Sequence, residues 1–427
     1  MKNRSTHKAI KNFVLHLHPL RLDARATAYN RTFGLGGIAA LLFTILFVTG
    51  ILLEFEYIPS AGKAYDSILS LKNDIIFGSL LRNIHYWSAM LLVVVTFLHL
   101  IRVFYSQSIF YERRKNWLYG LLLMFLVVSA NFTGYLLPWD QLSFWAVTIM
   151  TNLLEYIPLV GETLAKIIRD GDSVGEPTLL RFYHFHTGLL PLLMLFAVTI
   201  HFWLVRKAGG VALPKIENPK KINTHPHLTY REAYIALIVI TVILLFSIFV
   251  DAPLLDKAKP TVSPNPSRAP WYFMGFQELL MHVHPVFGSF IIPVAVTAFF
   301  IAIPFIKYPE LNTGVWFHSL KGKKITIRAA VFSALFTFAF ILSNDMIFKF
   351  GDRLASWPKI MSTGFLPTLL YIIPVGAFLF YLKKQKTANR IELVMAITTI
   401  ILAAYITMML TGIFLRGEGM QLIFLNS

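Results

Sequence analysis

Four histidines lie in two apolar stretches with a spacing that could hold a cofactor. His85 and His99 are fourteen residues apart in RNIHYWSAMLLVVVTFLHLIR, and His186 and His201 are fifteen apart in FYHFHTGLLPLLMLFAVTIHFWLVRK. On an α-helix, fourteen residues turn through about 1,400°, close to whole turns, and rise about 21 Å. The two histidines of the first stretch therefore share one helix face at two levels, and the second stretch repeats the pattern.

If both helices cross a membrane in the same direction, His85 meets His186 at one level and His99 meets His201 at the other. Haem iron takes two axial ligands, and imidazole suits it. A single histidine in lipid would more often pack or hydrogen bond, but two pairs at matched depths indicate a function. The pattern favours two bis-histidine haems stacked about 20 Å apart. His184 breaks the spacing and is expected to be a bystander.

Four glycines repeat the histidine period. Gly36 and Gly50 are fourteen residues apart in one apolar stretch, and Gly120 and Gly134 are fourteen apart in another. A glycine lets a flat ring approach the helix backbone closely, so these positions are expected to face the haems. Packing of helices through small residues is the alternative explanation.

Two arginines flank the first histidine pair on the sides toward the membrane surfaces. Arg82 and Arg102 each lie three residues beyond a histidine. A guanidinium pairs well with carboxylates, so we expect both to bind haem propionates. Snorkelling of long basic side chains toward the interface is the alternative.

The elements that must position these residues are membrane-spanning helices. Only 14% of the 427 residues are charged and 56% are hydrophobic, whereas a soluble domain has about 25% charged residues. Apolar runs of about 20 residues, long enough to cross a bilayer, recur along the chain. We predict an all-α, polytopic transmembrane bundle with a four-helix dihaem core. The nine expected spans are 34–54, 80–104, 117–137, 183–205, 233–250, 288–306, 328–344, 364–382 and 392–415.

Charge alternates between the predicted connections. Lys and Arg are concentrated in the N-terminal segment, which lacks a secretory signal pattern, and in the loops near 102–115, 206–232, 307–328 and 383–391. By the positive-inside rule the N-terminus is cytoplasmic and the C-terminus lies outside. The net charge of +17 is thus a topology signal, and nucleic acid is not an expected partner.

The chain has no cysteine. This excludes disulfides, thiolate-bound iron–sulfur clusters and a covalently attached haem, so any such centre must belong to a partner. The outer connections 139–182 and 251–287 are long for membrane loops. Loops of this length usually cover a site or carry one.

In its motifs the sequence resembles cytochrome b of the cytochrome bc complexes, the quinol:cytochrome c oxidoreductases. The resemblance rests on RNIHYWSA with HLIR, on GYLLPWDQLSFWAVTIMTNL, on RFYHFHTGLLP with HFWLVRKAGG, and on PWYF at 270–273. It covers residues 30–310 well and the rest loosely. The fifteen-residue spacing and HFWLVRK look like the split chloroplast and cyanobacterial type of cytochrome b, with that cytochrome b and its subunit IV fused here in one chain near residues 210–228.

The resemblance implies two non-covalent b haems, an outer one on His85 and His186 and an inner one on His99 and His201. It also implies a quinol-oxidising site on the outer side, walled by GYLLPWDQ and by the segment that matches the family's Pro-Glu-Trp-Tyr motif. The residues so identified are Tyr135, Pro138, Trp139, Pro270, Trp271 and Tyr272.

The motif departs from the family where Pro270, which cannot accept a proton, replaces the glutamate. We expect Glu278, seven residues past Trp271, to accept the proton instead, because burial in an aromatic and apolar stretch should raise its pKa. An interfacial helix residue is the alternative, and His282 and His284 are rival proton carriers. The lost glutamate favours a low-potential quinone such as menaquinone.

On the inner side the resemblance implies a quinone-reducing site. Arg206, Arg231 and Glu232 fall where the family has basic and acidic quinone-site residues. Ordinary basic charges of an inner loop are the alternative. Split-type relatives use a cysteine near Gly34 to attach an extra haem, which this chain cannot do.

The resemblance also implies the activity. One electron from quinol would pass to a mobile Rieske-type iron–sulfur protein and on to a cytochrome c-type partner. The other would cross the membrane through the two haems to the inner quinone, with protons released outside and taken up inside. The chain would be one subunit of a proton-translocating oxidoreductase, dimeric in the family, surrounded by lipid in a bacterial cytoplasmic membrane.

We divide the chain into a dihaem bundle at 1–222, a subunit IV-like region with the outer quinol-site loop at 223–350, and additional spans at 351–427. Two other functions remain open. A dihaem membrane anchor of a dehydrogenase or hydrogenase would lack the PWDQ and PWYF segments. A haem-free proton-coupled transporter, with histidines as proton relays, would leave the matched levels and the glycine period unexplained.

Overall fold

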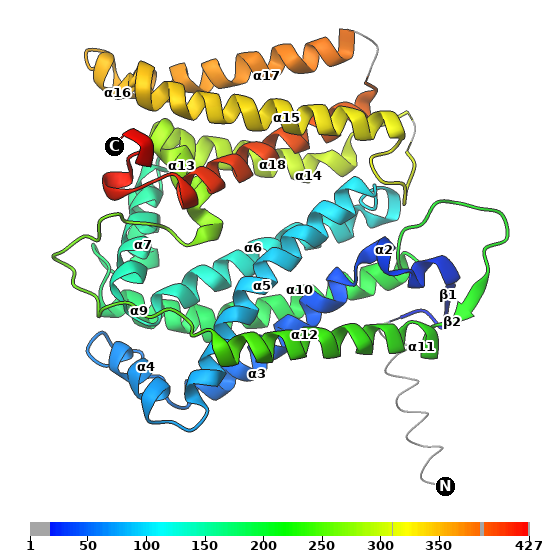
Figure 1. The fold of residues 1–427 in the computed structure, drawn as a ribbon, viewed down its shortest axis with the longest axis horizontal. Helices are drawn as coiled ribbons and strands as arrows, with labels where there is room; N and C mark the ends of the chain where they lie inside the picture. The colour runs from blue at the N-terminus through cyan, green and yellow to red at the C-terminus, as the bar shows by residue number, and fades with distance from the viewer. Residues whose placement is uncertain (1–17, 310, 385–387, 426–427) are drawn as a thin grey trace. The chain divides into compact units, whose positions relative to one another are not determined.

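The protein is almost entirely helical in the computed structural model, which describes residues 18–309, 311–384 and 388–425 (Figure 1). Within these residues nine segments are long and apolar enough to cross a membrane. The predicted all-α class is confirmed, and each predicted span overlaps one of these segments. They are Leu35–Glu54, Gly78–Tyr105, Tyr111–Leu136, Glu176–Lys207, Thr224–Phe249, Phe287–Phe305, Leu320–Phe348, Ile360–Lys384 and Arg390–Phe414.

The helices pack as two units. Among the described residues, the first unit contains 18–138, 182–254 and 312–316, and the second contains 139–181, 255–309, 311, 317–384 and 388–425. The first five spans thus pack together, and the last four pack with the helices of the long loop after Pro138. The division by function at 222 and 350 stays a prediction, since it does not follow these packing boundaries.

Four long helices form the centre of the first unit. They are α3 (Leu35–Glu54), α5 (Gly78–Tyr105), α6 (Arg114–Leu136) and α10 (Leu190–Lys207). In this bundle α5 packs against both α3 and α6, and α6 packs against α10 (Figure 1). A fifth helix, α12 (Thr229–Phe249), covers α3 and α5. Short helices precede four of the five, namely α2 (Tyr29–Thr32), α4 (Ala64–Asn73), α9 (Glu176–His184) and α11 (Thr224–His227).

Side chains from the start of α5 hold the end of α12 in place. The Arg82 guanidinium donates to the carbonyls of Ala252 and Pro253 at 2.8 and 2.7 Å. The Trp87 indole donates to the carbonyl of Val250 at 2.8 Å. These three carbonyls follow the end of α12 at Phe249, and the bonds satisfy groups that would be costly to leave unpaired.

A small antiparallel sheet joins two distant parts of the chain in the first unit. Strand β1 (Arg21–Asp23) pairs with β2 (Lys221–Asn223), with Leu22 opposite Ile222. The sheet therefore connects the N-terminal segment to the loop between the fourth and fifth spans.

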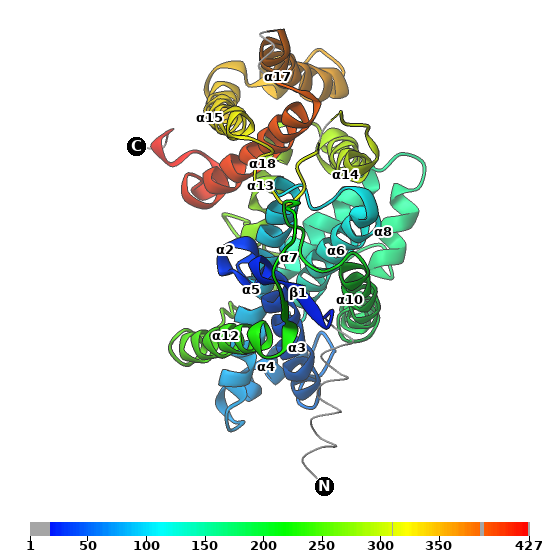
Figure 2. The ribbon, with the colours of Figure 1, turned by 90° about the vertical axis from the view of Figure 1, so that its right-hand side faces the viewer.

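The second unit is built around α18 (Arg390–Phe414), which contacts α13 (Met274–His282), α15 (Leu320–Ser343) and α17 (Leu366–Lys384) (Figure 2). Its remaining helices are α7 (Gln141–Asn152), α8 (Gly161–Arg169), α14 (Ile292–Ala302) and α16 (Phe350–Arg353).

Small residues allow α15 and α18 to approach closely. Ala329 of α15 and Ala396 of α18 are fully buried, in a cluster with Leu382 and Ile400. The Ser333 hydroxyl donates to the carbonyl of Ile400 at 2.8 Å. In lipid, where the hydrophobic effect between helices is absent, such close contact and interhelical hydrogen bonding hold helices together.

We therefore expect Ala329→Leu to lower the apparent melting temperature of the detergent-solubilised protein. Overpacking a close helix contact costs about 1–3 kcal/mol. Val331→Leu is the matched control, because Val331 lies on the same helix and is 54% exposed. An Ala329→Leu protein that melts with the Val331→Leu protein would contradict this packing.

Candidate haem centres and quinone sites

The structure brings the four predicted histidines together as two pairs. The imidazole centroids of His85 and His186 are 6.2 Å apart, with ring planes at 75°. Those of His99 and His201 are 6.4 Å apart, at 74°. His184 lies at the exposed end of α9, beside Tyr183 and outside both pairs.

The spacing of each pair fits one metal ion between two imidazoles. Two metal–nitrogen bonds of about 2 Å and two ring radii of about 1.1 Å add up to about 6.2 Å. The ring planes of both pairs are nearly perpendicular to each other. Both pairs therefore suit axial ligation of a haem iron.

Hydrogen bonds orient His85 so that one ring nitrogen is left for a metal. The Thr49 hydroxyl donates to the carbonyl of Ile45 at 2.7 Å, and its oxygen lies 2.9 Å from Nδ1 of His85. Because the single hydroxyl proton is used on Ile45, Nδ1–H of His85 must donate to Thr49. The other nitrogen, Nε2, then carries the lone pair that binds iron.

His186 is oriented in the same way by the backbone of α6. Its Nδ1 lies 2.9 Å from the carbonyl oxygen of Ala130, which can only accept. The proton is therefore on Nδ1, and Nε2 is again free to bind a metal. Sequence reasoning missed Thr49, although a threonine next to Gly50 in an otherwise apolar span was a usable signal.

Each of the four predicted glycines faces one of the four histidines. A Cβ atom placed on Gly36, Gly50 or Gly120 would lie 3.3, 3.4 or 3.8 Å from Cε1 of His99, His85 or His201, respectively. On Gly134 it would lie 2.5 Å from Cε1 of His186. The glycines thus make room for the imidazole edges and for whatever the imidazoles bind.

A π-helical turn accounts for the fifteen-residue spacing in the fourth span. Residues Phe185–Leu189 form a π segment in which the Leu190 amide donates to the Phe185 carbonyl, one residue further back than in an α-helix. A π turn accommodates one extra residue. His186 and His201 therefore have the same angular relation as two residues fourteen apart in α5, which is a continuous α-helix.

The two predicted propionate arginines are buried and already engaged with backbone. Arg82 binds the carbonyls after α12 as described above, and Arg102 Nε donates to the carbonyl of Arg31 at 2.9 Å. A third arginine, Arg113, donates to the carbonyls of Ala208 and Gly210 at 2.7 and 2.8 Å. Their binding of propionates stays a prediction.

The GYLLPWDQ segment connects the end of α6 to the start of α7. Tyr135 and Pro138 are partly buried at the end of α6, in the first unit. Trp139, in the second unit, is buried with φ of +53° and packs on Phe144. Asp140 then caps α7, accepting from the Ser143 amide at 2.9 Å.

In the second unit, α7 and α13 line a small cavity of about 30 Å³. We call it the α7–α13 crevice. Its walls include Ala146 and Met150 of α7 and Phe276, Gln277 and Leu280 of α13. Most of these side chains are apolar, as a quinone ring requires.

The predicted motif residues lead directly into α13. Pro270 precedes a 3₁₀ turn at Trp271–Phe273, and the Trp271 ring lies 5.5 Å from that of Tyr272. Tyr272 is buried, and its carbonyl accepts a hydrogen bond from the hydroxyl of Tyr405. None of these three side chains lines the crevice itself.

Glu278 lies on the opposite face of α13 from the crevice. At 100° per residue, Glu278 is about 160° around the helix from both Phe276 and Leu280, each two residues away. Its carboxylate is fully buried and is bound by Arg416, with Nε of Arg416 3.0 Å from Oε2, and by His282 Nε2 at 3.0 Å from Oε1.

The expected raised pKa of Glu278 is wrong. Burial does raise the pKa, but the hydrogen bonds from His282 and Arg416 and the charge of Arg416 outweigh it, so the pKa lies below its ordinary value. Sequence reasoning missed Arg416 because it lies 138 residues away, beyond the last span. Whether Glu278 serves quinol oxidation stays a prediction.

The inner-side residues are tied to the N-terminal segment. Arg231 donates to the Thr27 carbonyl and lies 5.4 Å from the ring centroid of Tyr29. Glu232 pairs with His18, Oε2 to Nε2, at 3.2 Å. Arg206 is exposed near the end of α10. A quinone site formed by these residues stays a prediction.

The chain is similar to known proteins over this site. The family model Cytochrome b/b6/petB matches residues 23–209. Cytochrome b6 of Synechococcus sp. (strain JA-3-3Ab) is 42% identical over 175 residues, 41% of this chain and 81% of that protein. Cytochrome b6 of Porphyra purpurea is also 42% identical over 175 residues, which again cover 41% of this chain and 81% of that protein. A solved structure titled hyperthermophilic respiratory Complex III has a TM-score of 0.67 at 22% identity, covering 92% of this chain and 94% of that one, which shows a shared fold.

Gly134→Ala should disturb the His85–His186 pair, because the new methyl group would overlap the His186 ring. We expect loss or altered absorption of one haem per chain, measured by a pyridine haemochrome assay and a reduced-minus-oxidised spectrum. Gly120→Ala is the matched control, since its Cβ would be in ordinary contact at 3.8 Å. Equal haem content and spectra in the two variants would contradict this role of Gly134.

Deleting Gly188 should leave both haems bound. Gly188 lies in the π segment, so the helix can become a regular α-helix and keep the two imidazoles in phase. In α5 there is no π turn to absorb a deletion. Deleting Val94 therefore turns His99 by about 100° relative to His85, and one haem should be lost. Haem stoichiometry distinguishes the variants, and the reverse pattern would refute the π-turn explanation.

Proposed function

The chain belongs to the cytochrome b/b6 family, and on that premise we propose that it is the dihaem cytochrome b subunit of a quinol-oxidising bc-type complex. Nine candidate membrane spans among the described residues agree with a multi-pass membrane protein. The observation that carries the proposal is the pair of imidazole pairs, each at iron-ligating distance and each ring facing a glycine.

His85 with His186 and His99 with His201 would each hold one b haem, and the two haems would carry an electron across the low-dielectric core. Thr49 and the Ala130 carbonyl fix the Nδ1 protons of the first pair, and so present Nε2 of each ring to the iron. Arg82 and Arg102 would place buried positive charge near the propionates.

No covalent haem is part of the proposal. Gly34 has φ of +65°, and a Cβ there would lie 3.0 Å from Cδ1 of Ile235. A side chain at this position would be strained and crowded. This supports the inference, drawn from the absence of cysteine, that no haem is attached covalently.

Quinol would be oxidised at the side that the charge pattern predicts to be outer. The corner at Tyr135, Pro138 and Trp139 and the segment Pro270–Tyr272 would wall the site, and the α7–α13 crevice would receive part of the quinol ring. Glu278 would lie on the opposite face of α13 from the crevice, as a carboxylate held in an ion pair with Arg416. The Pro270 substitution favours a low-potential quinone such as menaquinone.

Quinone would be reduced at the opposite side, near Arg206, Arg231 and Glu232. Arg231 and Glu232 are neighbours at the start of α12 and both face the segment 18–29. A cation and a carboxylate next to each other can orient a quinone oxygen and supply a proton. By the positive-inside rule this side is cytoplasmic.

The electron acceptors on the outer side would be separate polypeptides. The similarity of fold to a chain from a structure named as respiratory Complex III favours a multisubunit assembly. We propose a Rieske-type iron–sulfur protein and a cytochrome c-type partner, a dimer of the whole complex, and a bacterial cytoplasmic membrane as its location.

The purified protein should contain two non-covalent b haems per chain. Alanine variants of His85 or His186 should lose one haem, variants of His99 or His201 the other, and His184→Ala should keep both. A dithionite-reduced minus oxidised spectrum with a pyridine haemochrome assay measures this. Folded protein without haem, or loss of haem in His184→Ala alone, would refute the proposal.

A further inference from the structure

A buried cluster of charged groups in the second unit has no part in the haem sites. It joins Glu278 and His282 of α13 to Asp345, at the end of α15, and to Arg416, just after α18. Glu278, His282 and Arg416 are at most 5% exposed. Arg416 Nη1 lies 2.7 Å from Oδ2 of Asp345, in addition to the contacts with Glu278.

The cluster lacks one positive charge. Two carboxylates and one guanidinium give a formal charge of −1 when His282 is neutral. A net charge is costly in a buried site, and a proton on His282 would cancel it. The cluster therefore has the composition of a site that binds one proton.

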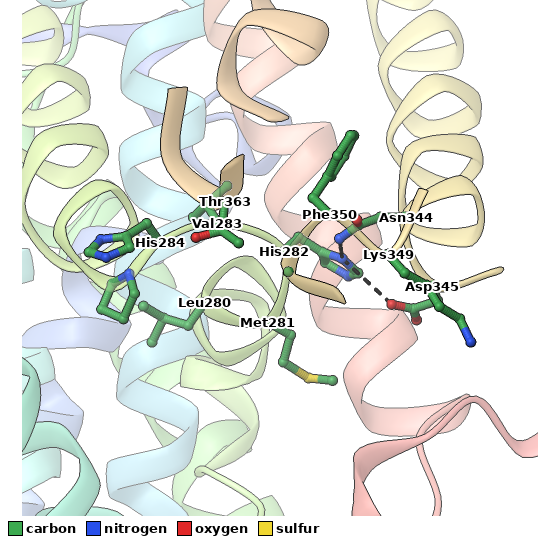
Figure 3. Close-up of a pocket in the computed structure, with 12 residues that line it drawn as sticks. Leu280, Met281, His282, Val283, His284, Asn344, Asp345, Lys349, Phe350 and Thr363 are labelled. Atoms are coloured by element: carbon green, nitrogen blue, oxygen red, sulfur yellow. Dashed lines mark hydrogen bonds and ion pairs between the residues drawn. The ribbon is translucent and has the colours of Figure 1, made fainter. Parts of the chain in front are cut away.

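Both ring nitrogens of His282 have partners that suit the binding of a proton. Nε2 faces Oε1 of Glu278 at 3.0 Å, while Nδ1 lies 2.7 Å from Nδ2 of Asn344 and 3.8 Å from Oδ1 of Asp345 (Figure 3). Neutral His282 can donate from Nε2 to Glu278 and accept at Nδ1 from the Asn344 amide. When Nδ1 is protonated, a rotated Asn344 amide presents its oxygen instead.

A cavity of about 460 Å³ lies against His282. We call it the α13–α15 cavity. His282, Asn344, Asp345 and Lys349 line it, and Figure 3 shows His282, Asn344 and Asp345 close together. Asn344 and Asp345 belong to a π segment, Asn344–Phe348, and π turns are frequent at functional sites.

The cavity and the α7–α13 crevice share one wall residue. Leu280 lines both of them. The crevice and the α13–α15 cavity therefore meet at the last turn of α13. Because Leu280 has no polar side-chain atom, a quinol proton would have to pass it through water to reach His282.

We propose that His282 is a proton-relay residue for quinol oxidation, accepting one of the two quinol protons at Nδ1 and releasing it through the α13–α15 cavity. This rests on the proposed function. In the step the quinol O–H bond breaks and an N–H bond forms, while the two electrons leave to the haem and iron–sulfur acceptors. Glu278 and Arg416 act as positioning residues that hold the imidazole and set the charge of the cluster.

The two groups that contact Nε2 of His282, Glu278 and Arg416, keep their charge. Burial lowers the pKa of Arg416, but its bonds to Glu278 and Asp345 raise it above its ordinary value overall. The pKa of Glu278 lies below its ordinary value, so it stays ionised at neutral pH. Lys349 also lines the cavity.

The rival histidine of the same cavity is a poorer proton acceptor. Burial and the charge of Lys359 both lower the pKa of His284. Its Nδ1 accepts from the Val286 amide at 3.3 Å, which uses it to shape the turn after α13. His284 thus provides a matched control on the same cavity wall.

The test compares His282→Gln and His284→Gln in membranes that contain the assembled complex. His282→Gln keeps a hydrogen-bonding side chain but cannot carry a proton, so quinol-driven reduction should fall about 100-fold. His284→Gln should stay within twofold of wild type. Both variants should keep two haems per chain and an unchanged dithionite spectrum.

Chemical rescue distinguishes a loss of proton transfer from a structural defect in the variant. Imidazole added to His282→Ala should restore turnover, because the adjoining cavity has room for it. Turnover of His282→Gln within twofold of wild type, or no restoration of His282→Ala by imidazole, would overturn the proposal. If the wild-type complex holds two haems yet oxidises no quinol, the proposed function fails instead.

A measurement on the wild-type complex covers the case in which the variants do not assemble. Quinol-induced infrared difference spectra with ¹⁵N-labelled histidine should show an imidazole gaining a proton during turnover. A spectrum without such a signal would contradict the proposal without any variant.

Discussion

The structure depends on one distance, the separation at which two imidazole rings can bond to the same iron. At about 6.2–6.4 Å between centroids, each imidazole of α5 lies at the distance from its partner in the fourth span that two iron–nitrogen bonds require. Every nearby feature serves this separation. Glycines on α3 and α6 clear the ring edges, Thr49 and the Ala130 carbonyl fix the tautomers, and the π turn brings the rings of the fourth span into phase.

A second constraint governs the other unit, where charge rather than metal ligation decides the arrangement. Arg416 follows the ninth span, and its pairing with Glu278 and Asp345 ties together the ends of α13, α15 and α18. Removing one partner of a buried ion pair leaves an uncompensated charge, at a cost of about 3–5 kcal/mol. The last spans therefore have a structural role beside α13, because they supply Arg416 and Asp345, the charged groups that surround Glu278.

Much of the first unit could be predicted because helical periodicity and ligand chemistry act over short stretches of sequence. The spans, the histidine pairs and the glycine positions all follow from a rise of 1.5 Å and a turn of 100° per residue. The partners of Glu278 could not be predicted, since Arg416 and Asp345 come from distant helices and no local pattern links them. The expectation of a raised pKa failed for that reason, because it considered burial without the cation that burial brings close.

The sheet of β1 and β2 has a consequence for how the two halves of such a chain stay together. The loop between the fourth and fifth spans is held at 221–223 by the N-terminal strand, and α12 is held at its far end by Arg82 and Trp87. The fifth span is thus fastened at both ends by non-covalent contacts, and the loop through Ala212 and Lys220 adds a covalent tether to the fourth span. A tether raises the effective concentration of the second half near the first. Synthesis as one chain therefore fixes the one-to-one supply of the halves, while the contacts that join them would serve two separate chains equally well.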